Sequence, residues 1–165
     1  MTVRDEITRH GYLAGMVPGD HAIDRYIELH IEQGPMLEAA GNSIGVVTGG
    51  QAIRWYQVTL TGEGTHAGPV PMAARRDPVP VLARVIDLAQ AVGTSDGQAR
   101  ATIGIIATEP GSINVVPGQI ILTVDLRHPD EDRLTELHTR FMAGVAALDQ
   151  GRVLSRLSPA TPSSR

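Results

Sequence analysis

Hydrophobic and polar residues alternate along several stretches of this 165-residue chain. Such alternation is typical of β-strands that bury one face. The first stretch is residues 26–33, which sets ionisable groups in an otherwise apolar run. A period of two places His30 on the same face as Glu28 and Glu32. The pattern therefore predicts a strand with a histidine between two carboxylates, ended by the glycine–proline pair that follows.

The rest of the first 50 residues reads as short elements. Residues 1–25 predict a short helix that ends near Gly15. Residues 35–41 predict a second short helix closed by Gly41, and residues 43–50 an apolar strand. Four further histidine and aspartate side chains in this part are typical of turn and cap chemistry rather than of a second metal site; they are His10, Asp20, His21 and Asp24.

The two glycines at positions 49 and 50 are the expected domain boundary, and regular elements follow them. Residues 52–62 alternate and are rich in β-branched and aromatic residues, which predicts a long, half-buried strand. A helix is expected to start with Asp77 as N-cap and Pro78 in its first turn. Residues 101–108 and 119–127 predict an antiparallel strand pair, and the run from Pro129 to Asp132 caps a second long helix.

Strand, helix, strand, strand, helix is the order of a ferredoxin-like βαββα(β) unit of the α+β class. The final strand of such a unit is at best weakly suggested after residue 149. From Ser158 onward the chain is rich in Ser, Pro and Arg. We therefore expect residues 149–165 to form a divergent, disordered tail.

Composition excludes several classes of function. The net charge is −4 with scattered arginines, which argues against nucleic acid and anionic membranes as partners. The chain has no cysteine, which excludes disulfides, thiolate catalysis and cysteine-ligated metals. No apolar run approaches the roughly 20 residues that a membrane-spanning helix needs. A cytoplasmic location is the default expectation.

Four segments together carry a resemblance to a known family. They are residues 28–35 (ELHIEQGP), 64–69 (GTHAGP), 111–118 (GSINVVPG) and 125–130 (DLRHPD). In this order they resemble motifs of N-carbamoyl-L-amino-acid hydrolases, allantoate amidohydrolases and β-ureidopropionases. These are binuclear-metal amidohydrolases related to aminoacylase and carboxypeptidase-G type peptidases. The resemblance covers about residues 5 to 147.

The resemblance implies a role for five residues. His30 corresponds to a metal ligand, and Gln33 to a substrate-contacting amide beside it. His66 corresponds to the catalytic, substrate-binding histidine that stabilises the oxyanion and reaches the partner subunit's site. Asn114 corresponds to a further substrate contact, and Arg127 to the clamp on the substrate carboxylate. From the residues alone other interpretations stay open: a structural histidine at position 30, a loop hydrogen bond for His66, a turn role for Asn114, and an ion pair of Arg127 with Asp125 or Asp130.

The resemblance also implies an organisation and a cofactor. Residues 1–49 correspond to the C-terminal part of a truncated metal-binding catalytic domain, and residues 50–148 to a lid and dimerisation domain. The implied cofactors are divalent ions, zinc or manganese, with nickel and cobalt as alternatives, and the implied assembly is a homodimer through the lid. The implied substrate is a small ureido or amide compound that bears a carboxylate.

Most of the family's metal ligands and its general-base glutamate have no counterpart in this chain. We therefore expect a fragment of a hydrolase of linear amide or ureido C–N bonds that is inactive alone. The alternative is a non-catalytic dimerisation or interaction module derived from the lid. That module would use a sheet edge left unpaired by the missing last strand.

Overall fold

A computed structural model describes residues 2–12, 19–20, 22–148 and 154–159. The chain divides into two units, Met1–Val46 and Val47–Arg165. Within the described ranges no helix is both long enough and apolar enough to cross a membrane.

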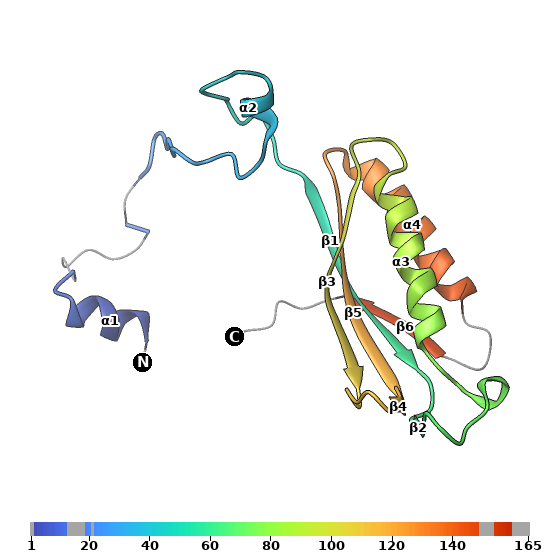
Figure 1. Cartoon of the computed structure of the whole chain (residues 1–165). Helices are drawn as coiled ribbons and strands as arrows, with labels where there is room; N and C mark the ends of the chain where they lie inside the picture. Colours follow the sequence, from blue (N-terminus) through green and yellow to red (C-terminus); the bar gives the residue numbers. More distant parts are fainter. Residues whose placement is uncertain (1, 13–18, 21, 149–153, 160–165) are drawn as a thin grey trace. The chain divides into compact units, whose positions relative to one another are not determined.

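A four-stranded antiparallel sheet organises the second unit (Figure 1). Its strands are β1 (Ala52–Thr61), β3 (Arg100–Glu109), β5 (Gln119–His128) and β6 (Leu154–Pro159), in the spatial order β3-β5-β1-β6. Helices α3 (Val79–Gly93) and α4 (Glu131–Ala147) cover one face. A two-residue ladder of β2 (Thr65–His66) and β4 (Val115–Val116), with a short 3-10 helix at Met72–Ala74, completes the unit. The predicted ferredoxin-like fold is confirmed.

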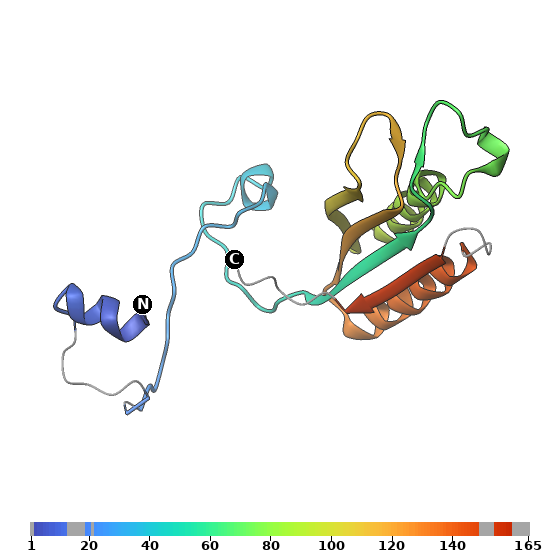
Figure 2. The ribbon, with the colours of Figure 1, turned by 90° about the horizontal axis from the view of Figure 1, so that it is seen from below.

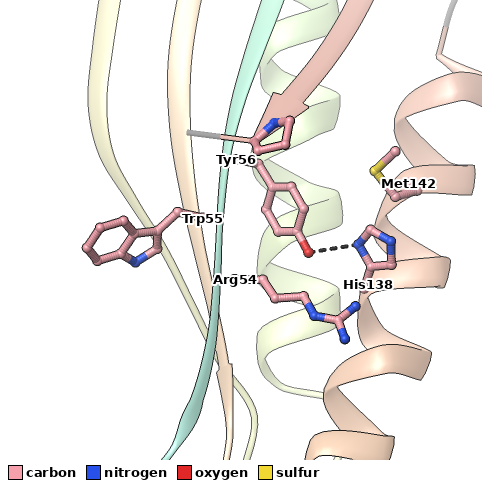
Figure 3. A pocket seen from close by; sticks show the side chains of 6 residues that line it. Arg54, Trp55, Tyr56, His138 and Met142 are labelled. Atoms are coloured by element: carbon pink, nitrogen blue, oxygen red, sulfur yellow. Dashed lines mark hydrogen bonds between the residues drawn. The ribbon is translucent and has the colours of Figure 1, made fainter. Parts of the chain in front are cut away.

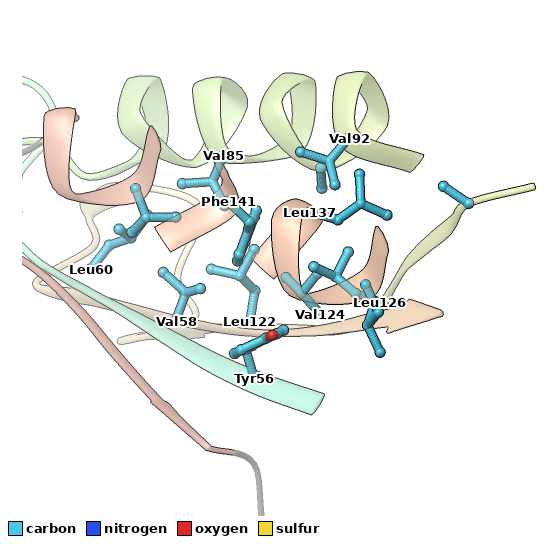
Figure 4. Packing of buried hydrophobic residues seen from close by; sticks show 14 of the residues in the cluster. Tyr56, Val58, Leu60, Val85, Val92, Leu122, Val124, Leu126, Leu137 and Phe141 are labelled. Carbon is cyan, nitrogen blue, oxygen red and sulfur yellow. The ribbon is translucent and has the colours of Figure 1, made fainter. Parts of the chain in front are cut away.

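The core lies between the sheet and the two helices (Figure 4). Strand β5 alternates strictly between half-buried and buried positions along its whole length, so every second side chain faces the helices. The same period holds for the buried part of β1. The largest fully buried hydrophobic side chains are Phe141, Leu60, Ile120, Leu122, Leu126 and Leu134. Aliphatic residues thus build this core, as the scarcity of aromatic residues requires.

The starts of the two helices show how local chemistry sets their bounds. The N-cap of α4 is Asp130, which lies in the predicted capping run, and its carboxylate accepts the backbone N–H groups of Asp132 and Arg133 at 2.8 and 3.0 Å. Helix α3 was expected to have Asp77 as N-cap, but its N-cap is Pro78. The Asp77 carboxylate still accepts the N–H of the first helical residue, at 2.9 Å. The cap is therefore displaced by one residue while its hydrogen bond is kept.

The expected absence of an ordered last strand was wrong. Strand β6 pairs antiparallel with β1 from Tyr56↔Pro159 to Thr61↔Leu154. Backbone N–H and C=O groups make these bonds, so a polar sequence with few β-formers can still pair when a strand edge is available. The described edge strands of the sheet are therefore β3 and β6. Residues 149–153 and 160–165 of the predicted tail lie outside the described residues.

The described residues of the first unit form two short helices, and neither of the two predicted strands is present. Helix α1 (Val3–Arg9) ends well before Gly15, which lies outside the described residues. Helix α2 (Met36–Ala39) is followed by Gly41 at φ 69°, as predicted. Residues 26–33 and 43–50 are neither helix nor strand, and Ile27 and Leu29 are 93% and 100% exposed. A strand needs a neighbour for its backbone groups, and these two segments pair with no described strand.

Candidate functional site

The loop that carries His66 follows the end of β1, and at its start the backbone at Gly62 and Glu63 lies close to two other backbone segments. The Gly62 N–H donates to the Gly118 carbonyl at 2.9 Å, and the Glu63 N–H donates to the Arg76 carbonyl at 3.0 Å. A Cβ atom on Gly62 would stand 2.1 Å from the Arg76 oxygen. Only glycine fits this approach, because the clashing atom belongs to the backbone and cannot rotate away.

The ladder of β2 and β4 brings His66 and Asn114 into adjacent segments. Its register pairs Thr65 with Val116 and His66 with Val115, and one residue beyond it the Ala67 N–H donates to the Asn114 carbonyl at 2.9 Å. Both loops project from the same end of the main sheet (Figure 2). The structure therefore places two of the predicted substrate residues side by side, both exposed.

The His66 imidazole has a defined tautomer in its neutral form. Its Nδ1 accepts the backbone N–H of Gly68 at 3.0 Å. A ring nitrogen that accepts a hydrogen bond carries no proton, so Nε2 is the N–H donor. A Cβ atom on Gly68 would come within 3.3 Å of the ring, which explains why a small residue stands there. The loop hydrogen bond thus leaves a free N–H donor at the exposed end of the ring.

Asn114 sits in a turn of its own. The Ser112 hydroxyl donates to the Asn114 side-chain oxygen at 2.8 Å, and the Val115 N–H donates to the Ser112 carbonyl. The side-chain oxygen is thereby oriented locally, which fixes the direction of the amide NH2 group as well.

Arg127 lies at the other end of the sheet. Its guanidinium forms three hydrogen bonds of 2.7 to 3.0 Å with Asp125, which raise the pKa of Arg127. The ion pair considered as an alternative is therefore present. Along β5 the eight steps from Gln119 to Arg127 span about 27 Å at about 3.4 Å per residue, and the ladder that carries His66 lies beyond Gln119. One small substrate cannot touch Arg127 and His66 of the same chain.

His30 and Gln33 do not lie in a β-strand, although the sequence predicted one for residues 26–33. His30 is exposed, and Gln33 has a left-handed backbone with φ 54°. The Glu32 carboxylate accepts the N–H groups of Met36 and Leu37, both at 3.0 Å, and so begins helix α2. The segment pairs with no described strand, so the predicted strand that would carry His30 and the two carboxylates is absent from the described residues.

The described residues do not fit a bound metal ion. Within the described ranges no group of three or more His, Cys, Asp or Glu side chains lies close enough to hold one. His21 lies outside those ranges.

A polar hollow of about 440 Å³ was not predicted from the sequence. It is lined by Asp96, Gln98, His128, Pro129, Asp130 and Arg133. His128 is buried at the end of β5, and its Nδ1 accepts the Asp130 N–H at 2.9 Å. Its Nε2 lies 3.1 Å from Asp96 Oδ2, although the two atoms are not aligned as a hydrogen bond. The Ser-Asp-Gly turn at 95–97 was the only sequence signal for Asp96.

The Asp96 side chain forms hydrogen bonds within the turn after α3 and also lines this hollow. Its Oδ1 accepts the N–H groups of Ala99 and Gln98 at 2.8 and 3.0 Å, and Arg133 lies 3.7 Å from its Oδ2. The hydrogen bond from Ala99 is the main cause that lowers the pKa of Asp96 below its usual 3.8, with further contributions from Gln98 and from the charges of His128 and Arg133.

This lowered pKa predicts an acid-dependent loss of stability. A carboxylate with a lower pKa in the folded state stabilises the fold above the unfolded-state pKa, and this contribution disappears as the pH falls through the folded-state value. Replacing Asp96 by asparagine should therefore lower the free energy of unfolding at pH 7, with a difference from wild type that shrinks below pH 3.8. Urea unfolding from pH 7 to 2 measures this. The control is Asp87→Asn, on the exposed side of α3, which reports the effect of removing one exposed carboxylate. A difference in unfolding free energy between Asp96→Asn and wild type that does not change with pH would contradict the prediction.

An apolar groove of about 340 Å³ lies beside β1, α4 and the end of β6. Figure 3 shows Tyr56 and His138 joined across it, with a hydroxyl-to-Nδ1 distance of 2.8 Å, while Trp55 points to the other side of β1. Burial raises the pKa of the Tyr56 phenol. The groove contains none of the predicted site residues, and its polar contact secures β1 to α4.

Comparison with known proteins gives these loops a family context. The family model described as the peptidase dimerisation domain of the M20 group matches residues 48–150. An N-carbamoyl-L-amino-acid amidohydrolase of Rhizobium meliloti is 39% identical over 140 residues, which are 84% of this chain and 34% of the relative. An allantoate amidohydrolase of Escherichia coli (strain K12) is 43% identical over 109 residues, 66% of this chain and 26% of the relative.

Solved structures agree with the sequence matches. An amidase of the hydantoinase/carbamoylase family from Burkholderia multivorans superposes with a TM-score of 0.83 at 40% identity, over 97% of this chain and 39% of that one. The chain spans about a third of the length of the curated relatives that it matches. The chain thus belongs to the M20 peptidase dimerisation domain family, as a partial-length relative of the N-carbamoyl-L-amino-acid and allantoate amidohydrolases.

Proposed function

We propose that this chain provides the lid, and one ligand-bearing segment, of a divalent-metal hydrolase of linear amide or ureido C–N bonds of the N-carbamoyl-L-amino-acid or allantoate type. The observation that carries the proposal is the paired His66 and Asn114 loops, with the imidazole Nε2–H free to donate. The names of the relatives support the reaction class.

In this proposal His66 and Asn114 act on the carbonyl oxygen of the scissile bond. Attack on an amide or ureido carbon places negative charge on that oxygen, and donors already oriented toward it lower the barrier. The Nε2–H of His66 is such a donor, because Nδ1 already accepts the hydrogen bond from the Gly68 N–H. The Asn114 amide supplies a second donor, since Ser112 already engages its oxygen.

Residues 1–49 would belong to the catalytic domain, with His30 as a metal ligand and Gln33 as a substrate contact. The exposed apolar side chains at 27, 29, 44, 46 and 47 support this assignment, because exposed runs of this kind are typical of surfaces that another part of a protein covers. Divalent ions supply an activated water in enzymes of this class. Since the described residues fit no metal ion, we assign this chain no step in water activation.

The proposal includes a homodimer. On one chain Arg127 lies about 27 Å along β5 from Gln119, and the β2–β4 ladder that carries His66 lies beyond that end of the strand. A substrate whose carboxylate binds Arg127 can meet His66 and Asn114 only if these come from a second copy. The edge strand β3 offers a surface for pairing, because Ile105 and Ile106 are 54% and 50% exposed on it.

A lid-derived interaction module without catalysis remains the second candidate, since the same β3 edge would serve it. The sheet edge first expected for this role is covered, because β6 occupies β1 from Tyr56 to Thr61. The two candidates differ in whether the His66 loop contributes to turnover.

Two assays test the proposal. The purified chain, incubated with zinc, manganese or cobalt, should bind no stoichiometric metal and should not hydrolyse N-carbamoyl-L-amino acids. A chimera in which residues 50–148 replace the matched segment of the Rhizobium meliloti amidohydrolase should hydrolyse them as a dimer. Turnover by the chain alone that is abolished by His30→Ala would overturn the fragment assignment. A folded, dimeric but inactive chimera would favour the interaction module.

A further inference from the structure

We propose that Arg75 is a positioning residue that fixes the tautomer and orientation of His66 by clamping the turn at residues 67–70. This inference deepens the proposed function, because it concerns the same loop. Its test reads the imidazole directly, so it can fail while the proposed function stands, and the reverse also holds.

The clamp consists of two hydrogen bonds to the two ends of one turn. Arg75 Nη2 donates to the Ala67 carbonyl at 2.6 Å, and Arg75 Nε donates to the Val70 carbonyl at 3.1 Å. The guanidinium is partly buried against this turn. Gly68, whose N–H holds the His66 ring, lies between the two carbonyls.

Ala67 connects the Arg75 hydrogen bonds to both the His66 loop and the Asn114 loop. Its N–H donates to the Asn114 carbonyl at 2.9 Å, while its C=O accepts from Arg75. The peptide unit that joins Ala67 to Gly68 contains this C=O and also the Gly68 N–H that selects the His66 tautomer. Fixing the Ala67 carbonyl fixes the plane of that peptide unit, because its C=O and N–H belong to the same planar group.

A planar guanidinium suits this task better than an ammonium group. Its N–H groups point in fixed, divergent directions, so one side chain can satisfy two carbonyls at once. Hydrogen bonds from a charged donor are also stronger than neutral ones. A lysine at position 75 would reach one carbonyl but would not hold the two in a fixed relation.

The experiment uses the full chain labelled with 15N on histidine and on the backbone. Long-range 1H–15N spectra report which ring nitrogen of His66 carries the proton, and amide exchange reports the Gly68 N–H. Arg75→Gln should convert the single Nε2–H form into averaged tautomers and speed Gly68 exchange about tenfold or more, the expected effect of losing charged hydrogen bonds. Arg75→Lys should give an intermediate result.

Arg76→Gln is the matched control, because the neighbouring arginine is 60% exposed and its one side-chain contact among the described residues is a 4.0 Å approach to Glu63. It should leave the His66 spectrum and Gly68 exchange unchanged. Amides of α3 and α4 report whether the fold survives each substitution. An unchanged His66 tautomer in Arg75→Gln would overturn the proposal. Global unfolding of both Arg75 variants would overturn it too, since Arg75 would then act on the whole fold rather than on His66.

Discussion

Replacing His66 by alanine in the dimeric chimera is expected to lower kcat about 10²- to 10³-fold, the effect of removing one oriented oxyanion donor. The KM should change much less, because this donor binds the charge that develops in the transition state rather than the substrate itself. The melting temperature should be preserved, since the ring is exposed and its one described hydrogen bond is local. Steady-state kinetics and thermal unfolding measure these quantities.

Ile113→Ala provides the control for the His66 substitution. Ile113 is fully exposed and lies in the loop beside Asn114. Its truncation should leave kcat close to that of the unsubstituted chimera. Equal kcat values for the His66→Ala and Ile113→Ala chimeras would remove His66 from the catalytic proposal. A fall in kcat that accompanies loss of the dimer would assign His66 to assembly.

Replacing Phe141 by alanine is expected to cost about 3–5 kcal/mol of folding free energy, the range for a large buried side chain. Phe141 is completely buried and packs against Tyr56 with ring centroids 5.7 Å apart (Figure 4). It is the only phenylalanine in the chain. Since small domains are stable by only about 5–15 kcal/mol, this loss is a large fraction of the total free energy of unfolding. Urea denaturation followed by circular dichroism gives the difference.

Arg140→Ala on the exposed side of α4 controls for a change in helix propensity at the adjacent position. Alanine is at least as good a helix former as arginine, so this variant should unfold within about 0.5 kcal/mol of the wild type. A Phe141→Ala variant as stable as Arg140→Ala would show that the sheet and helices do not depend on this contact.

Most of the second unit could be predicted from the sequence because its elements bury one face. Strands β1 and β5 and both long helices show the period of a half-buried element, and the structure has these elements and β3 within a few residues of the predicted bounds. Strand β6 has no such signal, because pairing with β1 depends on its backbone. At residues 26–33 the sequence predicted a strand that the structure does not have, because this segment has no described partner strand.

The candidate site could be predicted only in part, and for a different reason. Its residues were found by resemblance, while their arrangement depends on pairings distant in sequence. Nothing in the sequence indicates that His66 and Asn114 share a ladder, although the predicted strand at residues 119–127 already placed Arg127 at its end. Arg75 was not identified, because its bonds go to backbone carbonyls, which any sequence provides.

Strand β1 also gives the domain a mechanical property. It lies inside the sheet, held by β5 along its whole length and by β6 along half of it, and its end leads directly into the His66 loop. A strand of ten residues is about 33 Å long, so a rotation of about 5° at its Gly50 end would displace the loop by about 3 Å. Among the described residues, no atom outside the adjacent chain lies within 4 Å of the Cβ positions of Gly49 and Gly50. Since the sheet holds β1 in place, any backbone rotation at these two glycines would carry the whole sheet with it, and the His66 loop at the far end of β1 would move the most.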